Sequence, residues 1–268
     1  MNAQLSFEIT GHTRVLGILA DPIAHVKAPA GINAIARRRG RDAVMVPFQV
    51  APDRLSAWVA SLRDLKSFDG AVVTVPHKVA IVGLCDRVSD RARAIGAANV
   101  IRRAADGSLE ADMLDGAGFV AGLRGAGIEP RDKAAYLVGA GGAANAIAFA
   151  LAEAGVARLT LANRTLDKAE DLAARVRAAF PGVLVKVGTA DPSGHDLVVN
   201  GTSLGMRSGD SFPLDAAWLA PQMVVAEVIM EPAETALLAA ARAVGCRVHP
   251  GRPMLDHQLE LMADYFGL

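Results

Sequence analysis

The stretch Tyr136-Leu-Val-Gly-Ala-Gly-Gly-Ala-Ala144 has the pattern of a β-strand that ends in a glycine turn and opens a helix. Its glycines allow a tight turn that brings backbone N–H groups close to a pyrophosphate, and the helix dipole favours negative charge there. A glycine pattern alone is weak evidence, but here strand, turn and helix follow in order. The stretch therefore predicts a dinucleotide-binding turn made of Gly139, Ala140, Gly141, Gly142 and Ala143.

The next apolar run, Leu159–Ala162, ends in Asn163-Arg164-Thr165, 21 residues after Gly142. An NAD-binding domain usually carries an acidic residue here for the ribose hydroxyls, and that residue would repel a 2′-phosphate. An arginine instead pairs with a phosphate through charge-assisted hydrogen bonds. Asn163, Arg164 and Thr165 therefore favour NADP over NAD. Lys168, one helical turn later, either adds positive charge to this site or is a solvated surface lysine.

Outward from this turn, short apolar runs alternate with Ala- and Leu-rich stretches along most of the chain. This alternation predicts an α/β fold of βα units, with parallel sheets covered by helices on both faces. Strands are expected at 15–19, 43–48, 71–75, 135–138, 159–162, 197–200 and 223–229, and helices at 29–39, 52–62, 143–154 and 166–179. We expect a substrate-binding and catalytic domain of residues 1–117 with 240–268, and a Rossmann-type domain of residues 118–239.

The bulk composition excludes several function classes. The 28 basic and 28 acidic residues balance, which removes the general electrostatic case for nucleic acid or anionic membrane as a partner. No apolar run reaches the length of a membrane span, and Met1–Thr10 lacks the features of a signal peptide. Cys85 and Cys246 fit a reduced compartment. We expect a cytoplasmic, soluble monomer or homodimer with a small-molecule substrate and no metal site.

A second informative stretch is Gly70-Ala-Val-Val-Thr-Val-Pro-His-Lys78. Pro76 cannot donate to a strand ladder, so the apolar strand ends or lies at an edge there, and a lysine just past it can reach into a cleft. Such a lysine can act as a base toward an alcohol if burial lowers its pKa, whereas a neighbouring carboxylate favours its charged form. Because the two effects oppose each other, the sequence does not fix the pKa of Lys78.

At these residues the chain resembles the shikimate dehydrogenase family, a group that includes shikimate and quinate dehydrogenases. Eight motifs appear in order along nearly the whole length, which makes coincidence very improbable. They are Asp21-Pro-Ile-Ala-His25, Val73-Thr-Val-Pro-His-Lys78, Gly96-Ala-Ala-Asn99, Asp115-Gly116, Gly139-Ala-Gly-Gly-Ala143, Asn163-Arg-Thr165, Asn200-Gly-Thr-Ser-Leu-Gly-Met206 and Met254-Leu-Asp-His-Gln258.

The resemblance implies an NADP-dependent enzyme that interconverts 3-dehydroshikimate and shikimate by hydride transfer, in aromatic amino acid biosynthesis. It makes Lys78 and Asp115 the catalytic pair and adds Gly251 to the cofactor site. It also makes Thr74, Asn99, Asp115 and Gln258 ligands of the substrate. The alternative from the residues alone is a surface Lys78 and a helix-capping Asp115.

The chain departs from the family pattern where the substrate carboxylate would bind. The family's Ser-x-Ser is Val26-Lys27-Ala28 here, and a tyrosine near the end of a late strand is Met230. The usual Asn-Val-Thr is Val72-Val73-Thr74, and the usual Asn-Thr-Asp-Gly is Met113-Leu-Asp-Gly116. Each lost hydrogen bond to a charged group removes about 1.5–3 kcal/mol, so shikimate should bind roughly 10²-fold or more weakly.

These losses favour a paralogue that acts on a related cyclic polyol or hydroxy acid. His25 or Lys27 could supply a replacement cation for a carboxylate, although such residues more often face solvent. The alternative from a different class is a non-catalytic metabolite-sensing or regulatory protein. A sensor needs neither Lys78 nor Asp115, so their retention favours the enzyme.

Overall fold

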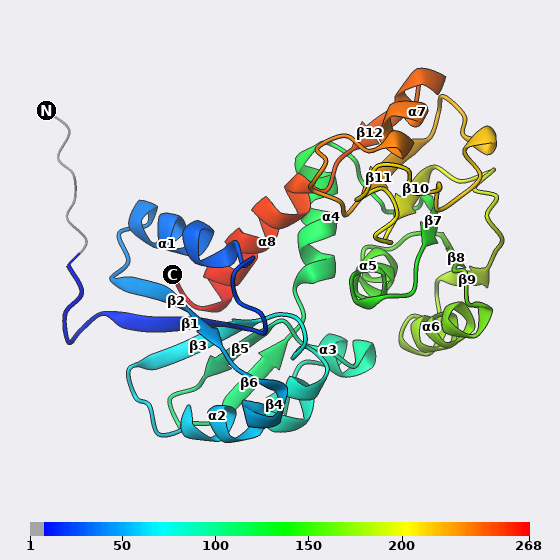
Figure 1. The fold of residues 1–268 in the computed structure, drawn as a ribbon. Helices are drawn as coiled ribbons and strands as arrows, with labels where there is room; N and C mark the ends of the chain where they lie inside the picture. Colours follow the sequence, from blue (N-terminus) through cyan, green and yellow to red (C-terminus); the bar gives the residue numbers. More distant parts are fainter. Residues whose placement is uncertain (1–7) are drawn as a thin grey trace, which may run out of the picture. The chain divides into compact units, whose positions relative to one another are not determined.

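The computed structural model describes residues 8–268, and within that range the strands form two six-stranded sheets (Figure 1). The predicted α/β class is confirmed. Residues 1–7, on which part of the signal-peptide expectation rests, lie outside the described residues. Within residues 8–268, no helix is both long and apolar enough to cross a membrane.

Two compact units make up the described chain. Unit 1 holds the described residues through Ala92 together with Gly96–Asp112 and Leu259–Leu268, and unit 2 holds Arg93–Ile95 and Met113–Gln258. The sequence analysis grouped residues 240–268 with the first part, whereas most of this tail lies in unit 2. The assignment of the two parts to substrate and cofactor stays a prediction.

The sheet of unit 1 has the strand order β2-β1-β3-β5-β6-β4. Its strands are β1 (Arg14–Ala20), β2 (Ala43–Gln49), β3 (Phe68–Val73), β4 (Arg87–Val88), β5 (Val100–Arg103) and β6 (Leu109–Asp112). The helices α1 (Ala28–Arg38), α2 (Leu55–Ser61) and the 3₁₀ turns η1 (Pro52–Arg54) and η2 (Ala80–Leu84) belong to this unit. The helices α3 (Asp90–Ile95) and α8 (Arg252–Tyr265) contribute residues to both units.

This first sheet is mixed, which corrects the expectation that both sheets are parallel. β1 pairs in parallel with β2 and β3, but β5 runs antiparallel to β3 and to β6. Only five residues, 104–108, join β5 to β6. So short a connection closes an antiparallel hairpin, whereas a parallel pair needs a crossover of a dozen or more residues.

The sheet of unit 2 is parallel throughout, with the strand order β12-β11-β10-β7-β8-β9. Its strands are β7 (Ala134–Val138), β8 (Arg158–Ala162), β9 (Leu184–Val187), β10 (Leu197–Asn200), β11 (Val224–Glu227) and β12 (Arg247–His249). The strand order reverses between β7 and β10. Ligands of such sheets bind at this switch point, outside the carboxyl ends of the strands.

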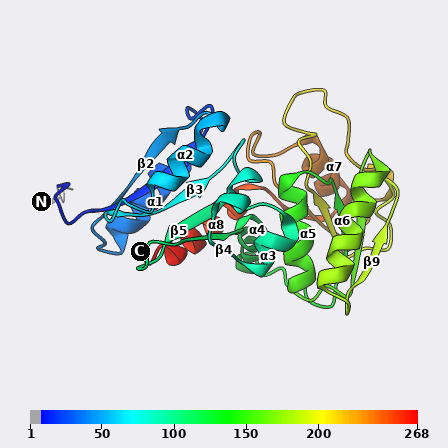
Figure 2. The same ribbon diagram turned by 90° about the horizontal axis from the view of Figure 1, so that it is seen from below.

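Helices cover both faces of the second sheet because its strands are apolar on both sides. Leu137 and Val199 pack into one core with residues of α4 (Asp115–Gly125), α5 (Gly142–Glu153) and α6 (Leu166–Ala179). Neighbouring positions such as Tyr136 and Val198 pack with α7 (Ala236–Val244) on the other face. A further 3₁₀ turn, η3, spans Ala216–Trp218. Figure 2 shows α5 and α6 side by side over the first of these faces.

Candidate active site

Three of the predicted site residues in unit 1 come together at one end of the first sheet. Thr74 follows the last residue of β3 and Asn99 precedes β5, and these two ends coincide because the strands are antiparallel. The Val73 N–H donates to the Asn99 carbonyl over 2.7 Å, and the Ala98 N–H donates to the Lys78 carbonyl over 2.8 Å. The backbone therefore holds Thr74, Lys78 and Asn99 around one spot, as expected for residues that share a substrate.

His77, next to the predicted catalytic lysine, is a packing residue. Its side chain is buried, and its Nε2 lies 2.8 Å from the Val50 carbonyl oxygen. The His77 N–H also donates to the Thr74 carbonyl over 2.9 Å, which closes a turn between β3 and Lys78. The sequence analysis did not give His77 a role. Its contacts fix the backbone that carries Lys78.

In unit 2, Asp115 begins α4 and its carboxylate accepts a hydrogen bond from the Gln258 side-chain amide of α8. Both side chains are buried. Gly118 makes this contact possible, because a Cβ at that position would lie 2.7 Å from the Cβ of Gln258. Sequence reasoning missed Gly118, although the Gly-rich composition of this helix was a signal. Gln258 therefore orients Asp115, and its predicted contact with substrate stays a prediction.

The glycine turn after β7 has the form that a pyrophosphate needs. Gly139 has φ +119°, and a Cβ there would lie 3.1 Å from Gly201 and from Thr202. At Gly141 and Gly142 an added Cβ would meet nothing within 4 Å, so an approaching ligand has open space. Gly141 caps α5 without a side-chain hydrogen bond, which leaves the first N–H groups of that helix available for an anion.

A second helix N-terminus without a side-chain cap follows the end of β8. Thr165 is the N-cap of α6, and its side chain does not cap the helix. Arg164 beside it is exposed, as is Lys168 in the first turn. The Asn163 side chain donates to the Thr165 carbonyl over 2.8 Å and so holds this corner in shape. Two cationic side chains and an uncapped helix N-terminus fit the 2′-phosphate of NADP.

Gly251 and Met230 lie at the β11 side of the same sheet. The Gly251 N–H donates to the Ile229 carbonyl over 3.1 Å, and any Cβ at Gly251 would collide with the backbone of Val228 and Ile229. Only glycine therefore allows this close approach. Met230 is 37% exposed, so the residue that replaces the family's tyrosine presents an apolar side chain to solvent.

The altered Ser-x-Ser segment leads into α1 of unit 1. Lys27 is the N-cap of this helix and is exposed, without a side-chain hydrogen bond that caps it. Val26 is half-buried and Ala28, the first helical residue, is 8% exposed. The two positions that bear hydroxyls in the family are therefore apolar in the folded chain as well as in the sequence.

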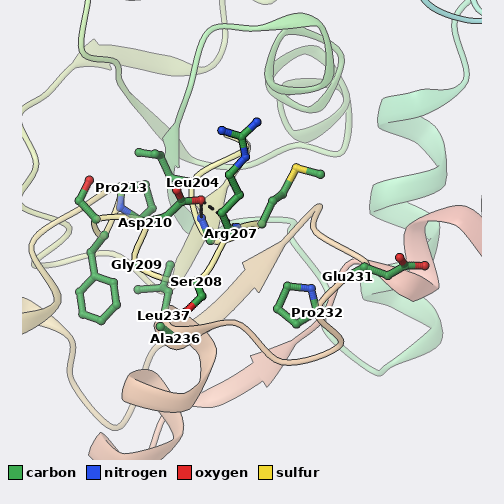
Figure 3. A pocket seen from close by; sticks show the side chains of 14 residues that line it. Leu204, Arg207, Ser208, Gly209, Asp210, Pro213, Glu231, Pro232, Ala236 and Leu237 are labelled. Atoms are coloured by element: carbon green, nitrogen blue, oxygen red, sulfur yellow. Dashed lines mark hydrogen bonds between the residues drawn. The ribbon is translucent and has the colours of Figure 1, made fainter. Parts of the chain in front are cut away.

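A cavity of about 760 Å³ lies elsewhere in unit 2 and contains none of the predicted site residues. Figure 3 shows its wall of residues from Leu204 to Pro213, faced by Pro232, Ala236 and Leu237. The Asp210 carboxylate accepts from the N–H groups of Gly205 and Arg207 over 2.9 and 3.0 Å, and these bonds lower the pKa of Asp210. Sequence reasoning did not anticipate this cavity.

Comparison with known proteins identifies the family. The family model described as the shikimate dehydrogenase substrate binding domain matches residues 18–101, and that described as shikimate / quinate 5-dehydrogenase matches residues 126–186. A curated relative, the shikimate dehydrogenase (NADP(+)) of Acidiphilium cryptum, is 42% identical over 97% of this chain and 93% of its own length.

Solved structures agree. The ligand-free 5-ketofructose reductase of Gluconobacter sp. strain CHM43 has a TM-score of 0.89 at 31% identity, covering 96% of this chain and 94% of its own. The shikimate 5-dehydrogenase of Thermus thermophilus, solved with NADP(H) and shikimate, has a TM-score of 0.85 at 30% identity, with the same coverage of 96% and 94%. The resemblance read from the motifs is thus confirmed, and the chain belongs to the shikimate dehydrogenase family of NADP-dependent oxidoreductases.

Proposed function

We propose that this protein transfers a hydride between NADP(H) and the secondary alcohol or ketone of a polyhydroxylated ring compound that carries no carboxylate. The observation that carries the proposal is the apolar start of α1. Val26 and Ala28 occupy the two hydroxyl-bearing positions of the family, while the predicted catalytic and hydroxyl-binding residues are retained.

The cofactor is held by three parts of unit 2. The turn Gly139–Ala143 and the α5 N-terminus receive the pyrophosphate, and Asn163, Arg164, Thr165 and Lys168 receive the 2′-phosphate. Gly251 borders the nicotinamide. Bound NADPH supplies the hydride. The open space at Gly141 and the uncapped N-termini of α5 and α6 support this assignment.

The chain's own residues supply the proton and hold the substrate. In the direction of reduction, the Lys78 ammonium donates a proton from Nζ to the carbonyl oxygen as the hydride arrives at the carbonyl carbon, and in oxidation the neutral amine takes the hydroxyl proton back. The family resemblance makes Asp115 the partner of this lysine, and the Asp115 carboxylate accepts a hydrogen bond from the Gln258 amide. Thr74 and Asn99 hydrogen-bond hydroxyl groups of the substrate, which fixes the reacting carbon.

The missing carboxylate sets the substrate class. An anion that entered beside Val26 and Ala28 would lose water without gaining hydrogen bonds from these side chains, at a cost of several kcal/mol. A substrate with no charged group at this position avoids the cost of desolvating an anion. The similarity to a 5-ketofructose reductase supports this reading, because 5-ketofructose is an uncharged polyhydroxy ketone.

The test is turnover on matched ketones, followed through the nicotinamide absorbance. We expect NADPH oxidation with 5-ketofructose and with ketones of cyclic polyols, and a high KM for 3-dehydroshikimate. The double variant Val26→Ser with Ala28→Ser should improve kcat/KM for 3-dehydroshikimate mainly through KM, because the carboxylate is remote from the reacting carbon. The same double variant should change the neutral substrates little.

Two results would count against the proposal. A low-micromolar KM of the unchanged protein for 3-dehydroshikimate would mean that His25, Lys27 or another group binds the carboxylate. Tight ligand binding without turnover on any ketone would instead favour a metabolite-sensing protein. A Lys78→Ala preparation serves as the baseline for non-enzymatic NADPH loss. A cytoplasmic location and a monomeric or homodimeric state stay predictions.

A further inference from the structure

A fully buried carboxylate lies at the carboxyl end of β11, outside the residues that the family motifs single out. Glu227 is 0% exposed. One of its oxygens accepts a hydrogen bond from the Asn200 side-chain amide over 2.8 Å, and the other accepts from the Thr235 hydroxyl over 2.6 Å. Both donors are uncharged, and within residues 8–268 the carboxylate forms no ion pair with a cation. Burial raises the pKa of Glu227.

Burying a carboxylate without a cation is costly, so its presence at this position calls for a role. Asn200 and Thr235 are themselves buried and belong to two other segments, the end of β10 and the N-cap of α7. Asn200 lies directly opposite Glu227 in the parallel ladder. The Thr235 hydroxyl also accepts from the Leu238 N–H, which fixes its orientation. Glu227 therefore ties three segments together.

Asn200 also forms hydrogen bonds with the segment that follows β10, residues 201–206, which we call loop 201–206. The Asn200 side-chain oxygen accepts from both the N–H and the hydroxyl of Thr202, over 3.0 and 2.7 Å. Its amide also donates to the Leu204 carbonyl over 3.0 Å. On the far side, Gly205 packs against Thr235, whose Cβ would lie 3.4 Å from a Cβ at Gly205. The network thus fixes both the start and the end of the loop.

Loop 201–206 is a direct neighbour of the cofactor turn. Gly139 of that turn packs against Gly201 and Thr202, as described above. The loop lies on the β10 side of β7, whereas Arg164 and the α6 N-terminus lie on the β8 side. A dinucleotide crosses the carboxyl edge of such a sheet from one half to the other. With the 2′-phosphate at β8, the nicotinamide half falls at the ends of β10 and β11.

We propose that Glu227 is a positioning residue that, through Asn200 and Thr235, holds loop 201–206 in the shape that receives the nicotinamide half of NADP(H). The inference rests on the cofactor assignment in the proposed function. It does not make Glu227 a catalytic residue, since its side chain is fully enclosed by the protein. The proposal implies that binding of the adenosine half of the cofactor does not depend on Glu227, whereas binding of the nicotinamide half does.

The experiment compares ligands that carry one or both halves. Adenosine 2′,5′-bisphosphate carries the adenosine and the 2′-phosphate, and NADPH adds the nicotinamide half. Glu227→Gln removes the negative charge and turns one of the two acceptor oxygens into an amide donor, so the network keeps a single acceptor where it had two. Thr235→Val removes the hydroxyl at nearly constant volume, and Thr235→Ser keeps the hydroxyl as the matched control.

We expect Glu227→Gln and Thr235→Val to raise the Kd for NADPH about tenfold, an effect typical of residues that act on a binding site through a network of contacts. The Kd for the bisphosphate should stay within about twofold of that of the unchanged protein. Thr235→Ser should behave as the unchanged protein. If NADPH and the bisphosphate lose affinity equally, or if neither does, the positioning role is wrong. A Glu227→Gln protein that does not fold leaves Thr235→Val against Thr235→Ser to decide.

Failure of the proposed function gives a different result. If the unchanged protein binds neither NADPH nor the bisphosphate, the cofactor assignment itself is wrong. If it binds both and the variants do not separate them, only the role of Glu227 is overturned. Thermal unfolding of each variant is measured alongside, so that a general loss of stability is told apart from a loss confined to one half of the site.

Discussion

Replacing Arg164 with alanine is expected to weaken NADPH binding and to leave NADH binding nearly unchanged. The Arg164 side chain is exposed and, among the described residues, makes no hydrogen bond, so its guanidinium is available to a 2′-phosphate. A hydrogen bond between charged groups contributes about 1.5–3 kcal/mol, and exposure to water and salt favours the lower end. About 1.5 kcal/mol corresponds to a roughly tenfold rise in the Kd for NADPH.

The assay is a fluorescence titration with NADPH and with NADH, at low and at high salt. The matched control is Arg177→Ala, which removes the same charge from the other end of α6, where the side chain donates to the Val185 carbonyl. We expect the control to bind both cofactors as the unchanged protein does. The NADPH loss in Arg164→Ala should shrink as salt rises, because salt screens the pair. Equal losses for NADPH and NADH would refute the 2′-phosphate assignment.

Two further predictions concern catalysis and stability. Lys78→Ala should lower turnover by about 10²–10⁴ without unfolding the protein, and Asp115→Asn should lower it too, with effects that do not add because the pair acts as a unit; near-normal turnover of both single variants would exclude the pair. Burial and the nearby charges of Arg247 and His257 lower the pKa of His249. The free energy of unfolding should therefore fall as pH drops below about 6.5, because His249 binds a proton in the unfolded chain before it does so in the folded chain. In His249→Phe, urea unfolding should lack this acid-dependent loss, which amounts to at most about 1.4 kcal/mol for each pH unit; a difference between the two proteins that is constant with pH would contradict it.

Local sequence patterns determined much of this protein. The glycine turn after β7, the arginine after β8 and the alternation of strands and helices each depend on neighbours within a few residues, and each was readable without the fold. The strands β1, β2, β3, β7, β8, β10 and β11 and the helices α1, α5 and α6 lie where the apolar pattern predicted them. Backbone conformation and apolar periodicity depend on residues within this short range, so they can be predicted from the local sequence.

The rest was decided by contacts between distant segments. β5 joins β3 as an antiparallel partner, and β12 joins β11 although it was grouped with the first part of the chain. The contact between Asp115 and Gln258 spans 143 residues, and it exists because Gly118 lets α8 approach α4.

The Glu227 network depends on tertiary structure for the same reason. Its three members come from β10, β11 and the start of α7, and no spacing in the sequence marks them as partners. A lone glutamate at the end of an apolar run is equally compatible with a solvated strand end. The parallel register of β10 and β11 places Asn200 beside Glu227, and the packing of the α7 N-terminus brings Thr235 to its other oxygen.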